Sequence, residues 1–178
     1  PPPAQSPLIA HYPFDDGTAR DYARDHHGNF VGDATVINDP VRGMVLSLDG
    51  AGDYVDCGNK SDFDLTQAIT VSAWINVSAW PATGSADWTA IVTKGDSAWR
   101  IHRWGNGNGI NFAGTGQNPL SHGFTPAPDP PGIVDGQWHM VTGTYDGSTR
   151  RLFIDGALVA SGAVTGSISV NNLNVNIG

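Results

Sequence analysis

The amino-acid sequence predicts an all-β protein, a sandwich of two antiparallel sheets within a single domain. The 178 residues include 23 glycines and 12 prolines, residues that turn or end strands. Between them lie short runs in which apolar and polar residues alternate, which is the period of a half-buried strand. A chain of this length can bury one sizeable core. Composition, alternation and length together favour many short strands around one core.

The clearest strand signal lies between Trp138 and Gly156. Alternation after Trp138 indicates one strand, which the turn-forming residues 146–149 end. Residues 151–155 resume as a second strand, and Asp155 with Gly156 suits a tight primed turn into a third strand. The segment therefore predicts two successive hairpins, which form a three-stranded antiparallel meander.

The rest of the chain divides into a short linker and one domain. Residues 1–7 are Pro-rich and predict the end of an extended linker, so that the domain spans residues 8–178. Leu8–Phe14 is expected to form the first strand, with Pro13 at a sheet edge because proline cannot donate to a ladder. Further strands are expected at residues 44–48, 53–55, 69–77, 90–94, 97–104 and 110–113.

Several motifs are similar to those of a known family. A tryptophan-histidine pair, a tyrosine-aspartate-glycine turn and an aspartate-glycine hairpin occur at Trp138, His139, Tyr145, Asp146, Gly147, Asp155 and Gly156. Residues 46–55 (LSLDGAGDYV) add a second such motif. The sequence thereby resembles the laminin G-like jelly-roll modules of the concanavalin A-like lectin/glucanase superfamily. The resemblance implies a jelly-roll sandwich over nearly all of residues 8–178, with Trp74 as a core tryptophan.

The end of the chain differs from this family. Residues 173–178 resemble the penultimate strand, after which members carry a closing strand that lies beside the first one. The sequence shows no such strand. We therefore expect either a clipped fragment or an edge that another chain supplies, because a missing strand leaves backbone groups that promote strand addition.

Charge and residue usage exclude several functions. The net charge of −8 and the presence of only two lysines, Lys60 and Lys94, argue against binding of nucleic acid or of an anionic membrane. No run of about 18 apolar residues predicts membrane insertion. All 17 acidic residues are aspartates, so the pair of catalytic glutamates found in glucanases of this superfamily is absent.

Aromatic and planar polar side chains concentrate between residues 80 and 111. Sugar sites combine aromatic faces, which stack on the sugar ring, with polar groups that bind hydroxyls. The expected glycan site consists of Arg100, His102 and Trp104 on one face of a strand, with Trp88, Asn106 and His122 as neighbours. His122 belongs to a long Pro-rich surface loop at residues 117–131. In the alternative, Arg100 and His102 only face solvent, and Trp80 and Trp88 anchor a loop.

Oxygen donors gather in the first loop of the predicted domain. The set consists of Asp15, Asp16, Thr18, Asp21 and Asn29, which offer the hard oxygen ligands that calcium prefers. Members of the family that the chain resembles hold a structural calcium near this loop. The expected cofactor is therefore a structural Ca²⁺ at these residues, and the alternative is a set of ordinary turn aspartates.

These features favour a non-catalytic, lectin-like carbohydrate-binding module, an accessory part of a secreted or cell-surface multidomain protein. Its partner would be a polysaccharide or another glycan, with no nucleic acid and no membrane insertion. A protein-interaction or adhesion module, which binds a polypeptide through its loops or through the open sheet edge, is the alternative. A glycoside hydrolase that uses aspartates is a third hypothesis, although the sequence contains no recognised catalytic motif.

Overall fold

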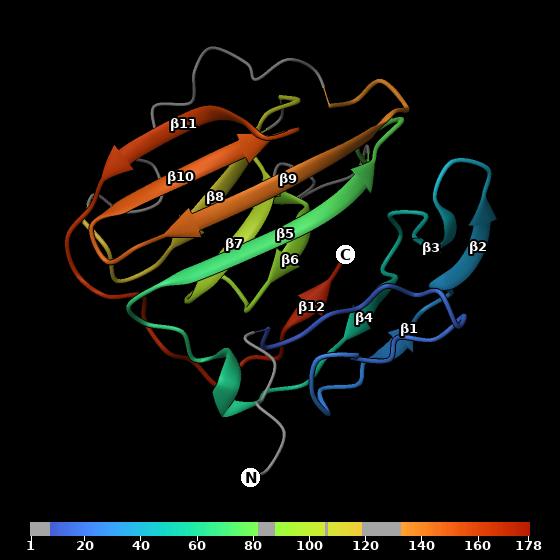
Figure 1. Cartoon of the computed structure of the whole chain (residues 1–178), viewed down its shortest axis with the longest axis horizontal. Helices are drawn as coiled ribbons and strands as arrows, with labels where there is room; N and C mark the ends of the chain where they lie inside the picture. Colours follow the sequence, from blue (N-terminus) through green and yellow to red (C-terminus); the bar gives the residue numbers. More distant parts are fainter. Residues whose placement is uncertain (1–7, 82–87, 106, 119–132) are drawn as a thin grey trace, which may run out of the picture.

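The structure is a computed structural model that describes residues 8–81, 88–105, 107–118 and 133–178 (Figure 1). Its strands form a six-stranded sheet, a four-stranded sheet and a separate two-stranded hairpin. The two larger sheets enclose one apolar core. The antiparallel all-β sandwich expected from the sequence is confirmed. The linker predicted at residues 1–7 lies outside the described residues.

The six-stranded sheet combines strands from distant parts of the chain. Its order is β1 (Asn29–Val31), β4 (Tyr54–Asp56), β12 (Asn176–Ile177), β6 (Ala90–Thr93), β7 (Trp99–Arg103) and β8 (Ile110–Gly114). Neighbouring strands in this sheet are antiparallel. The strand expected at residues 173–178 is present as the two-residue β12, which lies between β4 and β6 inside the sheet.

The four-stranded sheet contains the predicted meander. Its order is β11 (Ala157–Ala163), β10 (Thr149–Ile154), β9 (Trp138–Tyr145) and β5 (Ile69–Asn76). Asp155 and Gly156 both have positive φ, 51° and 79°, as the predicted primed turn requires. Among the described residues, β5 forms one edge of this sheet.

Two small elements complete the described part of the chain. β2 (Thr35–Asp39) and β3 (Gly43–Ser47) form a hairpin whose strands pair with neither of the larger sheets (Figure 1). A 3-10 turn, η1, spans Ser61–Phe63. Of the residues described, none belongs to a helix with the length and apolar character needed to cross a bilayer.

The two sheets approach closely where Phe112 of β8 meets Gly143 of β9. Phe112 is fully buried, and a Cβ atom on Gly143 would overlap its ring. A glycine inside a strand often marks such a close approach. Trp99 of β7 fills the core nearby, and its indole Nε1 donates to the carbonyl oxygen of Phe63 at 2.9 Å. The buried indole N–H is thereby satisfied.

The prediction of a first strand at Leu8–Phe14 is wrong, because these residues form no regular secondary structure. The backbone N–H of His11 donates to the carboxylate of Asp21 at 2.8 Å, and its carbonyl accepts the N–H of Tyr22 at 2.9 Å. Pro13 has no N–H to donate. Backbone groups that a sheet would use are therefore bound to the loop that follows.

The expectation that Trp74 lies in the core is also wrong. Trp74 points away from the core on β5 and is 47 % exposed. The guanidinium of Arg42 lies 3.7 Å from the centre of its ring, a cation–π contact. Trp138 donates from Nε1 to Asp39 Oδ1 at 3.2 Å. Both contacts hold the β2–β3 hairpin against the four-stranded sheet.

His139 of β9 lies between two carboxylates. Its Nδ1 is 2.7 Å from Asp155 Oδ2, and its Nε2 is 3.3 Å from Asp135 Oδ1. The hydrogen bond to Asp155, and after it the one to Asp135, raise the pKa of His139 above its ordinary value against the effect of burial. The imidazole of His139 therefore ties the start of β9 to the turn between β10 and β11.

We expect Asp155→Asn to lower the pKa of His139 toward the ordinary value of about 6.5, as measured by NMR titration of the imidazole. Asparagine tolerates the φ of 51° at this position, so the turn persists. Because the folded-state pKa is raised, this stabilisation is complete below the unfolded-state pKa and is lost as pH rises through the folded-state pKa. The wild type should therefore lose its stability advantage over the variant in that window. An unchanged His139 pKa in Asp155→Asn would contradict the assignment.

Candidate functional site

Trp88 and Trp104 form an aromatic pair at one end of the six-stranded sheet. Trp88 shortly precedes β6 and Trp104 directly follows β7, and the antiparallel pairing places the start of β6 beside the end of β7. The ring centres are 5.3 Å apart and the rings stand at 90°, an edge-to-face contact. Trp88 is 49 % exposed. The structure thus brings together two side chains of the predicted glycan site.

His102 lies beneath this pair and is nearly buried, with 2 % of its surface exposed. Its ring centre is 5.5 Å from that of Trp88. Nδ1 is 2.6 Å from the carbonyl oxygen of Arg103, so Nδ1 carries the proton, and Nε2 accepts from the amide of Asn111 at 3.3 Å. His102 is therefore a neutral support for Trp88, and neither the expected sugar contact nor the solvent-facing alternative describes it.

Arg100 lies on the same face of β7 but binds other parts of the protein. Its Nη1 donates to the carbonyl oxygen of Asp96 at 2.7 Å and to Thr115 Oγ1 at 3.3 Å. Its Nε is 3.4 Å from the carboxylate of Asp96. Desolvation lowers the pKa of Arg100. These contacts brace the β6–β7 turn against the end of β8, which assigns Arg100 a structural role.

The remaining predicted residues, Asn106 and His122, lie outside the described residues. Arg103, which was not predicted, holds the segment after Trp104. Its Nε donates to the carbonyl oxygen of Gly107 at 2.8 Å, and its guanidinium lies 5.7 Å from the centre of the Trp80 ring. The described part of the site is therefore the Trp88–Trp104 pair, supported by His102 and Arg103.

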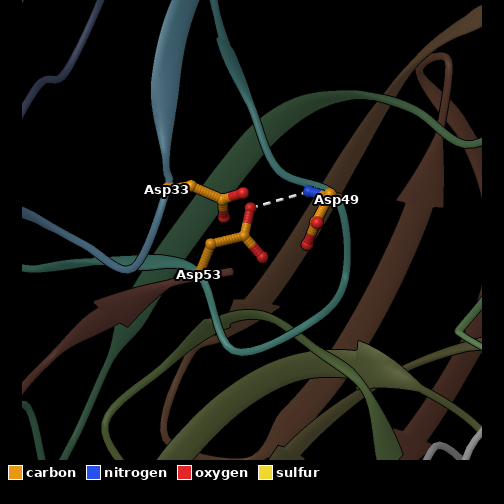
Figure 2. A group of neighbouring side chains, drawn as sticks. All are labelled: Asp33, Asp49 and Asp53. Atoms are coloured by element: carbon orange, nitrogen blue, oxygen red, sulfur yellow. Dashed lines mark hydrogen bonds between the residues drawn. The ribbon is translucent and has the colours of Figure 1, made fainter.

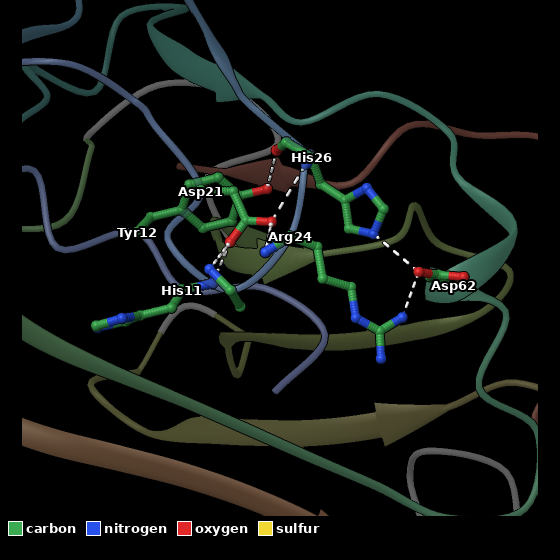
Figure 3. A network of polar contacts seen from close by, with 7 residues as sticks. His11, Tyr12, Asp21, Arg24, His26 and Asp62 are labelled. Carbon is green, nitrogen blue, oxygen red and sulfur yellow. Dashed lines mark hydrogen bonds and ion pairs between the residues drawn. The ribbon is translucent and has the colours of Figure 1, made fainter. Parts of the chain in front are cut away.

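Asp21, a member of the predicted calcium set, is bound by protein groups (Figure 3). It is 2 % exposed, and its carboxylate accepts backbone N–H groups at 2.8 to 3.2 Å, from His11, Ala23, Arg24 and His26. Burial opposes the charge, but these hydrogen bonds outweigh it and lower the pKa of Asp21. Asp21 therefore organises its loop.

Two other members of that set, Asp16 and Thr18, bind each other. Asp16 accepts the backbone N–H and the hydroxyl of Thr18 at 2.9 and 2.7 Å, and the hydroxyl of Tyr22 at 3.0 Å. Asn29 belongs to β1, and Asp15 is exposed. In the described ranges, these residues do not form a group of three neighbouring acidic ligands. Calcium at this set stays a prediction without support from the geometry.

Three other carboxylates do meet, those of Asp33, Asp49 and Asp53 (Figure 2). One oxygen from each lies within 4.8 Å of the others. Asp33 follows β1 and Asp53 precedes β4, and the antiparallel pairing of these strands brings them together. Asp53 also accepts the N–H of Asp49 at 2.6 Å. Their position at strand ends is the sequence signal that could have indicated this group.

A calcium titration distinguishes the predicted set from this observed group. If calcium occupies the observed group, its binding to the chelated protein, measured by calorimetry, is expected to weaken at least about tenfold in Asp33→Asn, because the group loses one carboxylate. Binding is expected to persist in Asp16→Ala. Loss in Asp16→Ala with retention in Asp33→Asn would restore the predicted set, and no binding to the wild type would contradict calcium as a cofactor.

The two antiparallel sheets around one core define the protein as a β-sandwich module of the jelly-roll class. Residues 49–178 match the family model described as the concanavalin A-like lectin/glucanases superfamily, of laminin G type. The match covers well over half of the chain, and the chain belongs to this superfamily. The family resemblance of its motifs is thereby confirmed. Comparison with curated proteins gives no match.

Three solved structures share the fold. Domain 4 of AbnA, a GH43 extracellular arabinanase from Geobacillus stearothermophilus in complex with arabinotriose, has a TM-score of 0.69 at 16% identity, over 98% of this chain and 84% of that chain. The binding domain of Paraclostridial Mosquitocidal Protein 1 has a TM-score of 0.63 at 14% identity, over 92% of this chain and 44% of that chain. The binding domain of Botulinum Neurotoxin DC in complex with SialylT has a TM-score of 0.52 at 15% identity, over 88% and 42%. At these identities the likeness shows the fold.

Proposed function

We propose that the chain is a non-catalytic carbohydrate-binding module, which holds glycan on the surface formed by Trp88 and Trp104. The observation that carries the proposal is Trp88, which is 49 % exposed and yet packs against Trp104 and His102. A large aromatic side chain held in one orientation offers an apolar face at low cost in conformational entropy. Such a face complements the C–H face of a sugar ring.

The mechanism is recognition without covalent change. Trp88 stacks on the sugar ring, and Trp104 holds the Trp88 side chain in place through their edge-to-face contact. The hydrogen bonds of His102 to Arg103 and Asn111 fix the support beneath it, so that little ordering remains to be done when the ligand binds. The chain contains no glutamate, and hydrolysis by a glutamate pair is therefore not part of the proposal.

The likeness to solved structures supports an oligosaccharide as the partner. The arabinanase domain was solved with arabinotriose and the neurotoxin domain with SialylT. We further propose that the chain is an accessory module of a secreted or cell-surface protein. The extracellular arabinanase, of which the similar structure is one domain, supports this part of the proposal.

Trp88→Ala is expected to weaken retention on polysaccharide gels by up to about tenfold, because aromatic stacking contributes about 0.5–1.5 kcal/mol beyond the area it buries and about 1.4 kcal/mol is a factor of ten. Affinity electrophoresis through a panel of gels, each containing one soluble polysaccharide, measures the loss. Trp88→Phe retains an aromatic face and should retain part of the binding. Thermal unfolding of each variant verifies that the fold persists.

Trp74→Ala is a matched control for this experiment. Trp74 is 47 % exposed and Trp88 is 49 % exposed, so the two variants remove similar exposed surface. Trp74 lies on the other sheet, away from the proposed site. Trp74→Ala should leave retention unchanged. Equal retention of Trp88→Ala and the wild type on every gel that retards the wild type would contradict the proposed site.

A second candidate function is protein interaction through β5. This strand is a sheet edge in the described part of the chain, and edge strands accept a further strand by β-augmentation. Sedimentation over a range of concentrations tests this alternative in its simplest form. Association that increases with concentration would favour it, whereas a monomer at every concentration would argue against self-association through β5.

A further inference from the structure

A recess lies far from the aromatic pair, in the loop that precedes β1. It is a shallow, open pocket of about 350 Å³, lined by Thr18, Ala19, Arg20, His27 and Gly28. β4, β12 and β6 lie between β1 and β7 in the six-stranded sheet, which corresponds to roughly 19 Å at the usual strand spacing. The pocket is therefore separate from Trp88 and Trp104.

The walls of this pocket are held in place by backbone contacts. The N–H of Gly28 donates to the carbonyl oxygen of Ala19 at 2.8 Å and joins the two sides. A Cβ atom on Gly28 would lie 2.5 Å from Val55 and 3.2 Å from Ala19 Cβ, so only glycine fits this approach. Behind the pocket, the hydrogen bonds of the buried Asp21 fix the course of the loop (Figure 3).

The polar lining offers both donors and acceptors. Nδ1 of His27 accepts the N–H of Asp21 at 3.2 Å, so the neutral ring carries its proton on Nε2 and can donate from there. Arg20 is exposed and adds its guanidinium donors. The hydroxyl of Thr18 donates to Asp16 at 2.7 Å, which leaves its oxygen as an acceptor.

An aromatic ring stands beside these groups. Tyr22 is 53 % exposed, and its hydroxyl donates to Asp16 Oδ2 at 3.0 Å. The guanidinium of Arg20 lies 5.2 Å from the centre of the Tyr22 ring. The same carboxylate therefore anchors both Tyr22 and Thr18. An anchored, half-exposed ring beside fixed hydrogen-bonding groups has the composition of a sugar site.

We propose that Thr18, Arg20, Tyr22 and His27 form a second glycan site that binds one neutral sugar unit. The inference rests on the proposed function, that the chain binds glycan. Tyr22 stacks on the sugar, while Arg20 and His27 donate to its hydroxyls and Thr18 accepts from one. A neutral sugar fits because the carboxylate of Asp16, which contacts Tyr22 directly, interacts with the guanidinium of Arg20 and balances its charge within the site.

Protein-detected NMR of the full chain tests this site with arabinose, xylose, glucose, galactose and arabinotriose as neutral probes and with glucuronate as an acidic probe. At least one probe is expected to shift the signals of the Arg20 side chain, Tyr22 and His27. Tyr22→Ala should weaken that response at least about tenfold, and Tyr22→Phe, which keeps the ring, should retain most of it. Trp88→Ala should leave it unchanged.

The outcomes separate this inference from the proposed function. Shifts confined to Trp88 and Trp104 would overturn the second site and leave the first in place. No shift at either site with any probe would overturn both. Shifts at Arg20 and Tyr22 with glucuronate but not with glucose would overturn the neutral-sugar assignment. Thermal unfolding of Tyr22→Ala, in which only a half-exposed side chain is removed, verifies that the variant is folded.

Discussion

Asp21→Ala is expected to destabilise the protein by about 3–5 kcal/mol, as measured by chemical denaturation. Asp21 is 2 % exposed, and its carboxylate accepts the backbone N–H groups of His11, Ala23, Arg24 and His26. Without it these donors lose their acceptor, and each donor left buried without a partner costs about 1–3 kcal/mol. Water that enters the space will offset part of this cost.

The pH dependence of this effect provides an independent check. Burial alone would raise the pKa of Asp21, but the hydrogen bonds outweigh burial and lower it. The stabilisation is therefore present above the unfolded-state value of about 3.9 and is lost as pH falls through the folded-state pKa. Asp25→Ala is the control, because Asp25 is exposed in the same loop. Equal stability of the two variants at neutral pH would contradict this role for Asp21.

Lys94→Met is expected to destabilise the protein by about 2–4 kcal/mol, because it leaves two hydrogen-bond acceptors of the buried ammonium group without a donor, at about 1–3 kcal/mol each, and removes the partner of the partly exposed Asp64 carboxylate. Lys94 has no exposed surface. Its Nζ donates to Asn59 Oδ1 at 2.6 Å and to the carbonyl oxygen of Leu173 at 3.0 Å, and lies 3.3 Å from Asp64 Oδ1. The ammonium group thus joins the end of β6 to two distant segments.

Lys60→Met is the matched control, because the chain contains only these two lysines and Lys60 is exposed. Its change in stability should stay within about 0.5 kcal/mol. The double variant Lys94→Met/Asp64→Leu should recover part of the loss, since it removes both charges. A Lys94→Met variant as stable as Lys60→Met would show that the buried ammonium is not needed for folding.

Regular alternation predicted the best-defined strands, and β5 illustrates its strength. The pattern placed Thr70, Ser72, Trp74 and Asn76 on one face, and all four are exposed in the structure. The family resemblance placed Trp74 in the core and was wrong. Alternation determines which face of the sheet a side chain occupies, because successive side chains of a strand point to opposite faces. The large size of an aromatic residue favours burial only in general.

The Leu8–Phe14 strand failed for a reason that lies outside the segment. Its apolar run resembles a strand, but its backbone partners are the side chain of Asp21 and the backbone of Tyr22. Side-chain acceptors that compete for backbone groups do not alter the local pattern. Such contacts can be recognised only when the path of the neighbouring loop is known.

Part of the candidate site followed from the sequence. Trp88 and Trp104 flank two strands that were both predicted, and antiparallel pairing brings such flanking residues together. The roles of Arg100 and His102 did not follow, because their partners Asp96, Thr115 and Asn111 depend on register and on turn geometry. Alternation predicts the face of the sheet on which a side chain lies, but it does not predict which groups that side chain contacts.

The most direct test of carbohydrate binding is a glycan-array screen of the folded chain, once with calcium and once with chelator. We predict binding to at least one glycan, retained in Trp74→Ala and lost in Trp88→Ala. Binding that requires calcium would link the sugar to a metal, and binding that does not would limit any metal to stability. A blank array from folded wild-type protein, or hits that Trp88→Ala leaves unchanged, would contradict the proposed site.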